Sequence, residues 1–201
     1  MYKDPNYENF PEWKILNTFT TDLPGNHFYR INKTSDGAMW FASASYGIAE
    51  YKNEEWKTYQ SPDRGVTGEM LNCIYVNDAG DCYGGAQLKG LYKREGDALV
   101  RKPKETFGYG NKNIKDVFVD DEGYVWIAHI AGVDRCKDGS CESFNKKNGL
   151  LSNNVFYLKT DSKNRVWVTN TKGVSIYDHG SWSNYTKKEN GLEGYVYEIV
   201  E

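Results

Sequence analysis

Apolar residues fall in short groups of strand length along this chain, and the groups repeat at a near-constant period. An aromatic residue preceded by an apolar one recurs at steps of 43, 43 and 41 residues: Trp40, Tyr83, Trp126 and Trp167. A later glycine recurs at steps of 43, 42 and 41 residues: Gly47, Gly90, Gly132 and Gly173. Both landmarks give one period, and no helical pattern lies inside it. Such a period is typical of an all-β fold, the β-propeller built from four-stranded antiparallel blades.

Each repeat divides into four strands around a turn residue that tolerates positive φ. These turn residues are Gly37, Gly80, Gly123 and Asn164. Apolar residues nine and six positions earlier predict the first strand: Phe28 and Ile31, Leu71 and Ile74, Ile114 and Val117, Val155 and Leu158. An adjacent apolar pair after the turn predicts a second strand that packs on both faces. The third strand follows the glycine landmark, and the fourth follows a polar turn. We expect Trp40, Trp126 and Trp167 to be buried at equivalent positions.

The repeats predict a single domain over 1–201, with copies at about 24–65, 66–110, 111–150 and 151–192. Trp13 lies 43 residues before Trp56, so 13–19 predicts the outer strand of a preceding blade. Asn190 to Leu192 repeats the Asn-Gly-Leu that begins at Asn148, so 195–200 predicts the inner strand of a following blade. A fifth blade would thus be split between 1–23 and 193–201. Either the ring closes with five blades, or the chain is part of a larger propeller whose edge strands promote self-association.

Composition agrees with many short strands and excludes several partners. The chain is 15% aromatic and has 20 glycines, which suits strands joined by tight turns. Its net charge is −3 and its lysines are scattered, so we expect no nucleic-acid partner. No apolar run approaches the roughly 20 residues that a membrane span needs. The first residues also lack the charged-then-apolar form of a signal peptide.

The four cysteines pose a question about pairing. Cys136 and Cys141 flank an Asp-Gly turn, and a type I′ hairpin there would make them a close non-hydrogen-bonded pair. They form either a cross-strand disulfide or two free thiols. Cys73 and Cys82 lie on adjacent strands in offset register, where we expect two buried thiols. The spacings of Cys and His do not fit a zinc site, and we expect neither a metal nor a cofactor.

No pattern in the chain predicts an enzyme. His179 lies in an outer turn, whereas His129 lies in the loop between second and third strands as either an exposed loop residue or a ligand contact. Neighbouring carboxylates such as Asp120 and Asp121 lie in turns, where we expect solvated charges and not a catalytic pair. We therefore expect a non-catalytic protein.

The polar residues that break the repeat symmetry give a candidate ligand site. The connections between blades and the loops between second and third strands are expected to share one face around the axis. Amides and aromatic planes there suit the hydroxyls and ring faces of sugars. The predicted ligand-binding residues are Tyr46, Gln87, His129, Asn170, Asn26, Tyr109 and Asn111. The alternative is that these are ordinary polar loop residues.

The segment 148–177 resembles a known repeat family. Its Asn148-Gly149-Leu150, Asp161, Val166-Trp167 and Gly173-Val174 are similar to the two-component regulator propeller repeat of bacterial hybrid sensor kinases. Asp120, Gly123 and Trp126 follow the same pattern in the third copy. The second copy departs from it, with Tyr83 in place of Trp and Asn77 in place of Asp.

The resemblance implies an extracytoplasmic sensor module, in the periplasm or outside the cell, that binds a ligand such as a glycan fragment. It implies signalling through a membrane-linked kinase that this chain does not contain. The expected partner is therefore a small molecule or an oligosaccharide. The alternatives are a scaffold for a protein partner and, third, a hydrolase or lyase, since propellers can host such sites.

Overall fold

In the computed structural model, sixteen strands form four antiparallel sheets of four strands each within the described residues. The described residues are 16–19, 21–23, 25–44, 47–61, 71–191, 196 and 199. We call the sheets blades 1 to 4 in chain order. Blade 1 holds β1 (Phe28–Lys33), β2 (Met39–Ser43), β3 (Ile48–Lys52) and β4 (Glu55–Tyr59). Blade 2 holds β5 (Leu71–Val76), β6 (Cys82–Ala86), β7 (Gly90–Glu95) and β8 (Ala98–Lys102). Blade 3 holds β9 (Ile114–Val119), β10 (Val125–His129), β11 (Gly132–Lys137) and β12 (Ser140–Phe144). Blade 4 holds β13 (Val155–Thr160), β14 (Val166–Asn170), β15 (Gly173–Asp178) and β16 (Ser181–Thr186).

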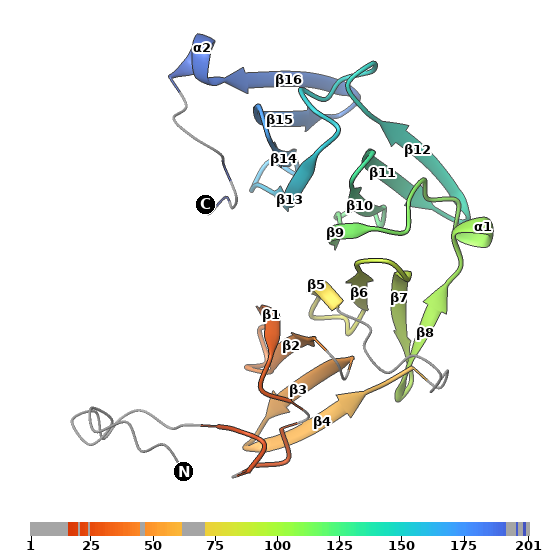
Figure 1. Ribbon diagram of the computed structural model, residues 1–201, viewed down its shortest axis with the longest axis vertical. Coiled ribbons are helices and arrows are strands. Elements are labelled where there is room, and N and C mark those ends of the chain that lie inside the picture. Colours follow the sequence, from red (N-terminus) through yellow and green to blue (C-terminus); the bar gives the residue numbers. More distant parts are fainter. Residues whose placement is uncertain are drawn as a thin grey trace.

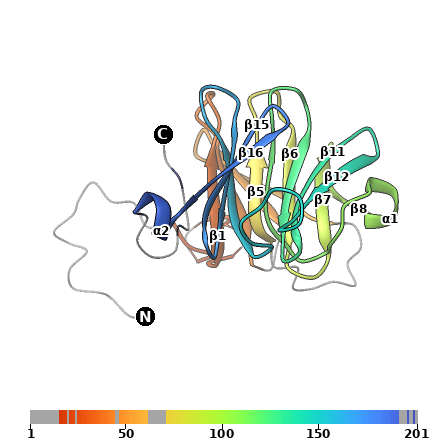
Figure 2. The same ribbon diagram turned by 90° about the horizontal axis from the view of Figure 1, so that it is seen from above.

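The blades stand side by side in an arc around a common axis, as a β-propeller requires (Figure 1). The first strand of each blade lies on the inside of the arc and the fourth on the outside, and consecutive inner strands are neighbours. The strands run largely along the axis, so the connections gather at two ends of the molecule (Figure 2). Two helices of four residues, α1 (Lys104–Phe107) and α2 (Lys187–Asn190), follow the outer strands of blades 2 and 4.

Every inner strand carries a β-bulge at the same place. The second residue of each is skipped in the pairing with the next strand: Tyr29, Asn72, Lys115 and Phe156. In a regular strand, residues three apart point to opposite faces, but one skipped residue returns them to the same face. The bulge therefore explains why the apolar pairs, such as Phe28 and Ile31, are spaced by three.

An aspartate holds the turn between the first and second strands of blades 3 and 4. Asp120 Oδ1 accepts the N–H groups of Glu122 and Tyr124, and its Oδ2 accepts the indole N–H of Trp126 at 2.7 Å. Asp161 does the same, with Trp167 Nε1 donating at 2.8 Å. The aspartate thus fixes both the turn and the large side chain that follows it.

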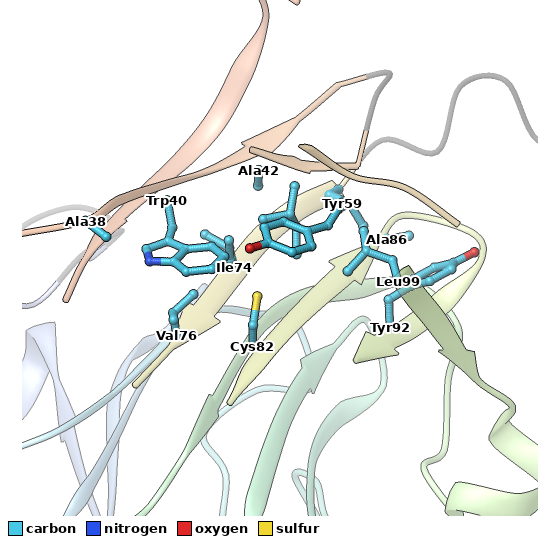
Figure 3. Packing of buried hydrophobic residues seen from close by; sticks show 12 residues of the cluster. Ala38, Trp40, Ala42, Tyr59, Ile74, Val76, Cys82, Ala86, Tyr92 and Leu99 are labelled. Atoms are coloured by element: carbon cyan, nitrogen blue, oxygen red, sulfur yellow. The ribbon is translucent and has the colours of Figure 1, made fainter. Parts of the chain in front are cut away.

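The hydrophobic core lies between adjacent blades, in three clusters for three interfaces. Figure 3 shows the first, where Trp40 and Tyr59 of blade 1 pack on Ile74, Val76 and Cys82 of blade 2. The other two clusters join blade 2 to blade 3 and blade 3 to blade 4. Each blade is therefore stabilised mainly by its neighbours, as in other repeat architectures.

The repeated aromatic position is buried where another described blade covers it. Trp126 is completely buried, and Trp40 and Tyr83 are 4% and 7% exposed. Trp167 is only partly buried, so the prediction for this residue is wrong. The reason is that blade 4 is the last described blade and no further described sheet lies over Trp167.

Cys136 and Cys141 form a disulfide, one of the two outcomes considered for this pair. They lie opposite one another on β11 and β12, next to a two-residue turn whose residues Asp138 and Gly139 have φ of 50° and 78°. Positive φ at both positions is the geometry of a type I′ turn. Cys73 and Cys82 are buried free thiols, as expected, and burial raises the pKa of Cys82 to about 12.

The proposed fifth blade stays a prediction. Of its outer strand, residues 13–15 lie outside the described residues, while 16–19 are irregular backbone and a turn, so a strand does not extend to Phe19. Asn17 accounts for this turn, because its side-chain oxygen accepts the N–H of Phe19 at 2.8 Å. Of the inner strand 195–200, only 196 and 199 are described.

Candidate functional site

The inner strands of all four blades surround a cavity of about 340 Å³ on the axis of the arc. We call it the channel pocket. Apolar residues line part of this pocket, and its polar side chains include both positive and negative charges. The polar side chains come from Arg30, Asn32, Tyr75, Asp116, Asp121, Tyr157, Lys159 and Thr160. A pocket formed where repeated strands converge is a default binding site when convergent polar groups line it.

Four equivalent positions directly after the bulges differ in chemistry, and three of them, all but the buried Cys73, line the pocket. They carry Arg30, Cys73, Asp116 and Tyr157, one on each inner strand. The Arg30 guanidinium lies over the Tyr157 ring, 4.6 Å from its centre. Because Arg30 belongs to blade 1 and Tyr157 to blade 4, this contact joins the two ends of the arc.

Asp116 is a buried carboxylate that links two blades. It is 4% exposed, and its oxygens accept the N–H groups of Val117 at 3.0 Å and of Leu158 at 2.8 Å. Leu158 lies on the inner strand of the next blade. Two backbone hydrogen bonds to one carboxylate stabilise its charged form, so Asp116 positions the wall of the channel pocket.

His129 is not an exposed loop residue. It is 3% exposed at the end of β10, and its Nδ1 accepts the N–H of Ala131 at 3.1 Å. Nε2 therefore carries the proton and donates to Asp134 at 2.9 Å. Asp134 also accepts the N–H of Gly110 and the hydroxyl of Ser143. Burial would raise the pKa of Asp134, but these hydrogen bonds outweigh burial and lower it.

Asn170 has the same role in blade 4. It is completely buried, its Nδ2 donates to Ser175 Oγ at 3.3 Å, and its Oδ1 accepts the N–H of Lys172 at 3.0 Å. Ser175 Oγ in turn accepts the N–H of Leu151, in the connection from blade 3. The two polar pairs, His129 with Asp134 and Asn170 with Ser175, thus anchor the loops of neighbouring blades to each other.

Tyr109 is also buried, and its hydroxyl donates to the carbonyl of Lys102 and accepts the N–H of Leu91. Asn111 and Asn26 are more accessible, but each accepts a backbone N–H of its own loop region, from Asn113 and Thr18. Gln87 is partly buried at the end of β6. Tyr46 lies outside the described residues.

The channel residues Arg30, Asp116 and Tyr157 were not predicted from the sequence. The signal was present in the repeat alignment, because one column holds Arg, Cys, Asp and Tyr in four otherwise similar strands. Three of its four residues are polar or charged on strands flanked by apolar positions, which indicates a polar channel, whereas the fourth, Cys73, lies in the core.

Other chemistry has little support among the described residues. No group of three or more His, Cys, Asp or Glu side chains in the described ranges is placed to hold a metal ion. Over the same residues, the helices are too short and polar to cross a bilayer. His179 is exposed and pairs with Asp178 next to it.

Comparisons with known proteins define the fold class. No protein-family model matches the chain, and no curated protein matches it by sequence. The extracellular domain of the hybrid two-component system BT4673 from B. thetaiotaomicron superposes with a TM-score of 0.68 and 16% identity, over 86% of this chain. The corresponding domain of BT3049 from the same organism gives 0.56 and 16%, also over 86%. A catalytically inactive virginiamycin B lyase from Staphylococcus aureus, solved with quinupristin, gives 0.62 and 13% over 83%.

These neighbours confirm the predicted resemblance to two-component regulator propellers at the level of the fold. The chain spans 25% of the solved extracellular domain of BT4673, 30% of that of BT3049 and 57% of the lyase chain. It therefore corresponds to a part of each of these propeller proteins.

Proposed function

We propose that this chain is the ligand-binding part of an extracytoplasmic sensor and that a small polar ligand, such as a glycan fragment, occupies the channel pocket. The observation that carries the proposal is the asymmetric polar column of the inner strands, on a fold shared with extracellular domains of two-component systems. A ligand that contacts all four inner strands would change the relative orientation of the blades. Such a change is the kind of signal that a linked kinase could receive.

A thermal-shift screen with oligosaccharides tests the proposal. A ligand present at a hundredfold excess over its Kd stabilises the folded state by about 2.7 kcal/mol, which is about 5–10 °C in Tm for a chain of this size. Lys159→Gln removes a charge from the channel pocket and should abolish the shift. Lys163→Gln makes the same change in the exposed turn that follows β13 and should keep the shift. Equal loss in both variants, or in neither, would refute the channel as the site.

The alternative, a scaffold for a protein partner, is favoured by two exposed apolar side chains. Leu88 and Ile130 are 73% and 48% exposed, in the loops between the second and third strands of the adjacent blades 2 and 3. A scaffold predicts that no oligosaccharide raises Tm. It also predicts that Leu88→Ser with Ile130→Ser weakens partner binding, whereas Lys159→Gln leaves it unchanged.

A hydrolase or lyase has less support. The loop histidine His129 is the best-placed candidate acid or base, and both of its ring nitrogens are already engaged inside the protein. A general acid or base must instead reach a proton of the substrate. We therefore propose a non-catalytic sensor, with self-association through sheet edges as a further prediction.

A further inference from the structure

The connection from blade 3 to blade 4, residues 144–155, borders an open cavity of about 580 Å³. We call it the loop pocket. Ala131, in the loop between β10 and β11, supplies one wall, and the connection supplies the rest through Asn145, Lys146, Lys147 and Asn153. None of these residues lines the channel pocket, so the two pockets are separate.

The two asparagines of the loop pocket present hydrogen-bond donors. Asn145 Oδ1 accepts the N–H of Lys147 at 2.8 Å, and Asn153 Oδ1 accepts the N–H of Lys146 at 2.7 Å. Neither Nδ2 group donates to another residue in the described part of the chain. Asn145 is partly buried, whereas Asn153 and both lysines are exposed, so a ligand can reach them.

Hydrogen bonds fix the backbone of this connection. The carbonyl of Asn145 accepts the N–H groups of Asn148 and Leu150, each at 3.1 Å. Asn148 Nδ2 donates to the carbonyl of Ser143 at 2.8 Å, and Leu150 is buried in the core between blades 3 and 4. A site whose groups are already held in place loses less conformational entropy when a ligand binds.

The charge at this end of blades 3 and 4 is positive. The loops 129–132, 144–155 and 170–173 contain no aspartate or glutamate and three lysines: Lys146, Lys147 and Lys172. The loop that carries Lys172 lies against the same connection, since the N–H of Thr171 donates to the carbonyl of Asn154 at 3.2 Å. None of the three lysines pairs with a carboxylate of the described residues.

The acidic residues of these two blades lie in turns at their other end. The turns 120–124 and 161–165 contain four acidic residues beside two basic ones. A strand of five residues spans about 17 Å, and exposed charges more than about 10 Å apart are largely screened at about 0.1 M salt. These carboxylates therefore do not neutralise the lysines of the loop pocket.

We propose that the loop pocket binds the oxyanion group, a carboxylate or a sulfate, of a small molecule. The oxygens of this group accept hydrogen bonds from Asn145 Nδ2 and Asn153 Nδ2. The ammonium groups of Lys146 and Lys147 supply the positive charge, and hydrogen bonds to a charged acceptor are stronger than those to a neutral one. This site is independent of the channel pocket and of the sensor function proposed for it.

Protein-observed NMR titrations test the proposal with three sugars that differ only at C6: glucose, glucuronate and glucose 6-sulfate. We expect both anions to bind the 1–201 chain about tenfold more tightly than glucose at an ionic strength of about 0.01 M, because two exposed ion pairs together are worth about that factor. The largest shifts should occur in residues 145–153, and the preference should disappear at about 1 M. The tighter of the two anions identifies the oxyanion that the pocket prefers.

Three variants locate the site. Lys146→Gln combined with Lys147→Gln should reduce the preference for the anions to about one. Asn153→Asp keeps an oxygen that accepts the N–H of Lys146 but replaces the donor with a negative charge, so it should also remove the preference, with Tm changed little. The matched control, Lys33→Gln combined with Lys163→Gln, removes two exposed lysines at the opposite end and should keep it.

Equal affinities for glucose and for both anions would overturn the proposal. A preference that survives Lys146→Gln with Lys147→Gln would place the binding elsewhere and overturn it too. Equal loss in the control would indicate an effect of net charge alone and contradict a defined site. A preference that Lys159→Gln removes would place the anion in the channel pocket, which also refutes the proposal.

Discussion

Replacing Trp126 with Ala tests whether the interfaces between blades carry the stability of the fold. Trp126 is completely buried and packs on Phe118 and Phe144 of its own blade and on Tyr177 of the next. A buried Trp→Ala change costs about 3–5 kcal/mol through lost contacts and the cavity that remains. The Asp120 carboxylate also loses the indole donor, which adds about 1 kcal/mol. We expect a total loss of about 4–6 kcal/mol, a large share of the 5–15 kcal/mol typical of a domain.

Trp167→Ala is the matched control for this prediction. Trp167 occupies the same position in blade 4 and makes the same bond to an aspartate, but it is only partly buried. We expect about 2 kcal/mol for this change, because less buried surface is lost. Urea unfolding followed by circular dichroism gives both values. An effect of Trp167→Ala equal to or larger than that of Trp126→Ala would refute the view that the next blade supplies the burial.

The remaining predictions concern a disulfide, a glycine and a carboxylate. Replacing Cys136 and Cys141 with Ser should lower the free energy of unfolding by about 2 kcal/mol or less, since the disulfide closes a very short loop. Reductant should lower the Tm of the wild type and leave the Tm of this Ser variant unchanged. Gly132→Ala should cost more than 3 kcal/mol in urea unfolding, because a Cβ would lie 2.1 Å from a backbone carbonyl oxygen, whereas Gly123→Ala, with open space, should cost about 1 kcal/mol. The pKa of Asp134 is lower in the folded state than in the unfolded state, so its carboxylate stabilises the fold at pH values above the unfolded-state pKa. This stabilisation is lost as pH falls through the folded-state pKa. Stability measured from pH 6 down to about pH 2 should therefore fall less steeply in Asp134→Asn than in the wild type, and parallel curves would contradict this role.

The fold could be predicted because two landmarks report the same period independently. Trp126 and Gly132 occur in register with their counterparts, and each position has one physical reason: a blade interface for the Trp and a close backbone approach for the Gly. The Asp-Gly turn similarly predicted a close approach of Cys136 and Cys141, because a two-residue turn fixes the register of a hairpin.

The candidate site was harder to predict because sequence shows which groups are polar but not which polar groups meet. A polar residue such as His129 next to a loop is expected to be exposed, yet it is buried and hydrogen-bonded to Asp134 on the neighbouring strand β11. The repeat alignment shows that Arg30 and Tyr157 break an apolar pattern, but the bulge that sets the face to which they point is not evident in the sequence. The predicted site lay in the loops, whereas the channel pocket is lined mainly by residues of the inner strands.

The bulge at the start of each inner strand also bears on how such a protein can change during evolution. The bulged residues Tyr29, Asn72, Lys115 and Phe156 take no place in the pairing of their strands, and the four side chains share no chemical property. Strand pairing does not constrain which side chain stands there. Each repeat can thus acquire a different side chain there while strand register is kept, and Asn72 shows one use of this freedom, since its Nδ2 donates to the carbonyl of Ile114 in the next blade at 3.0 Å.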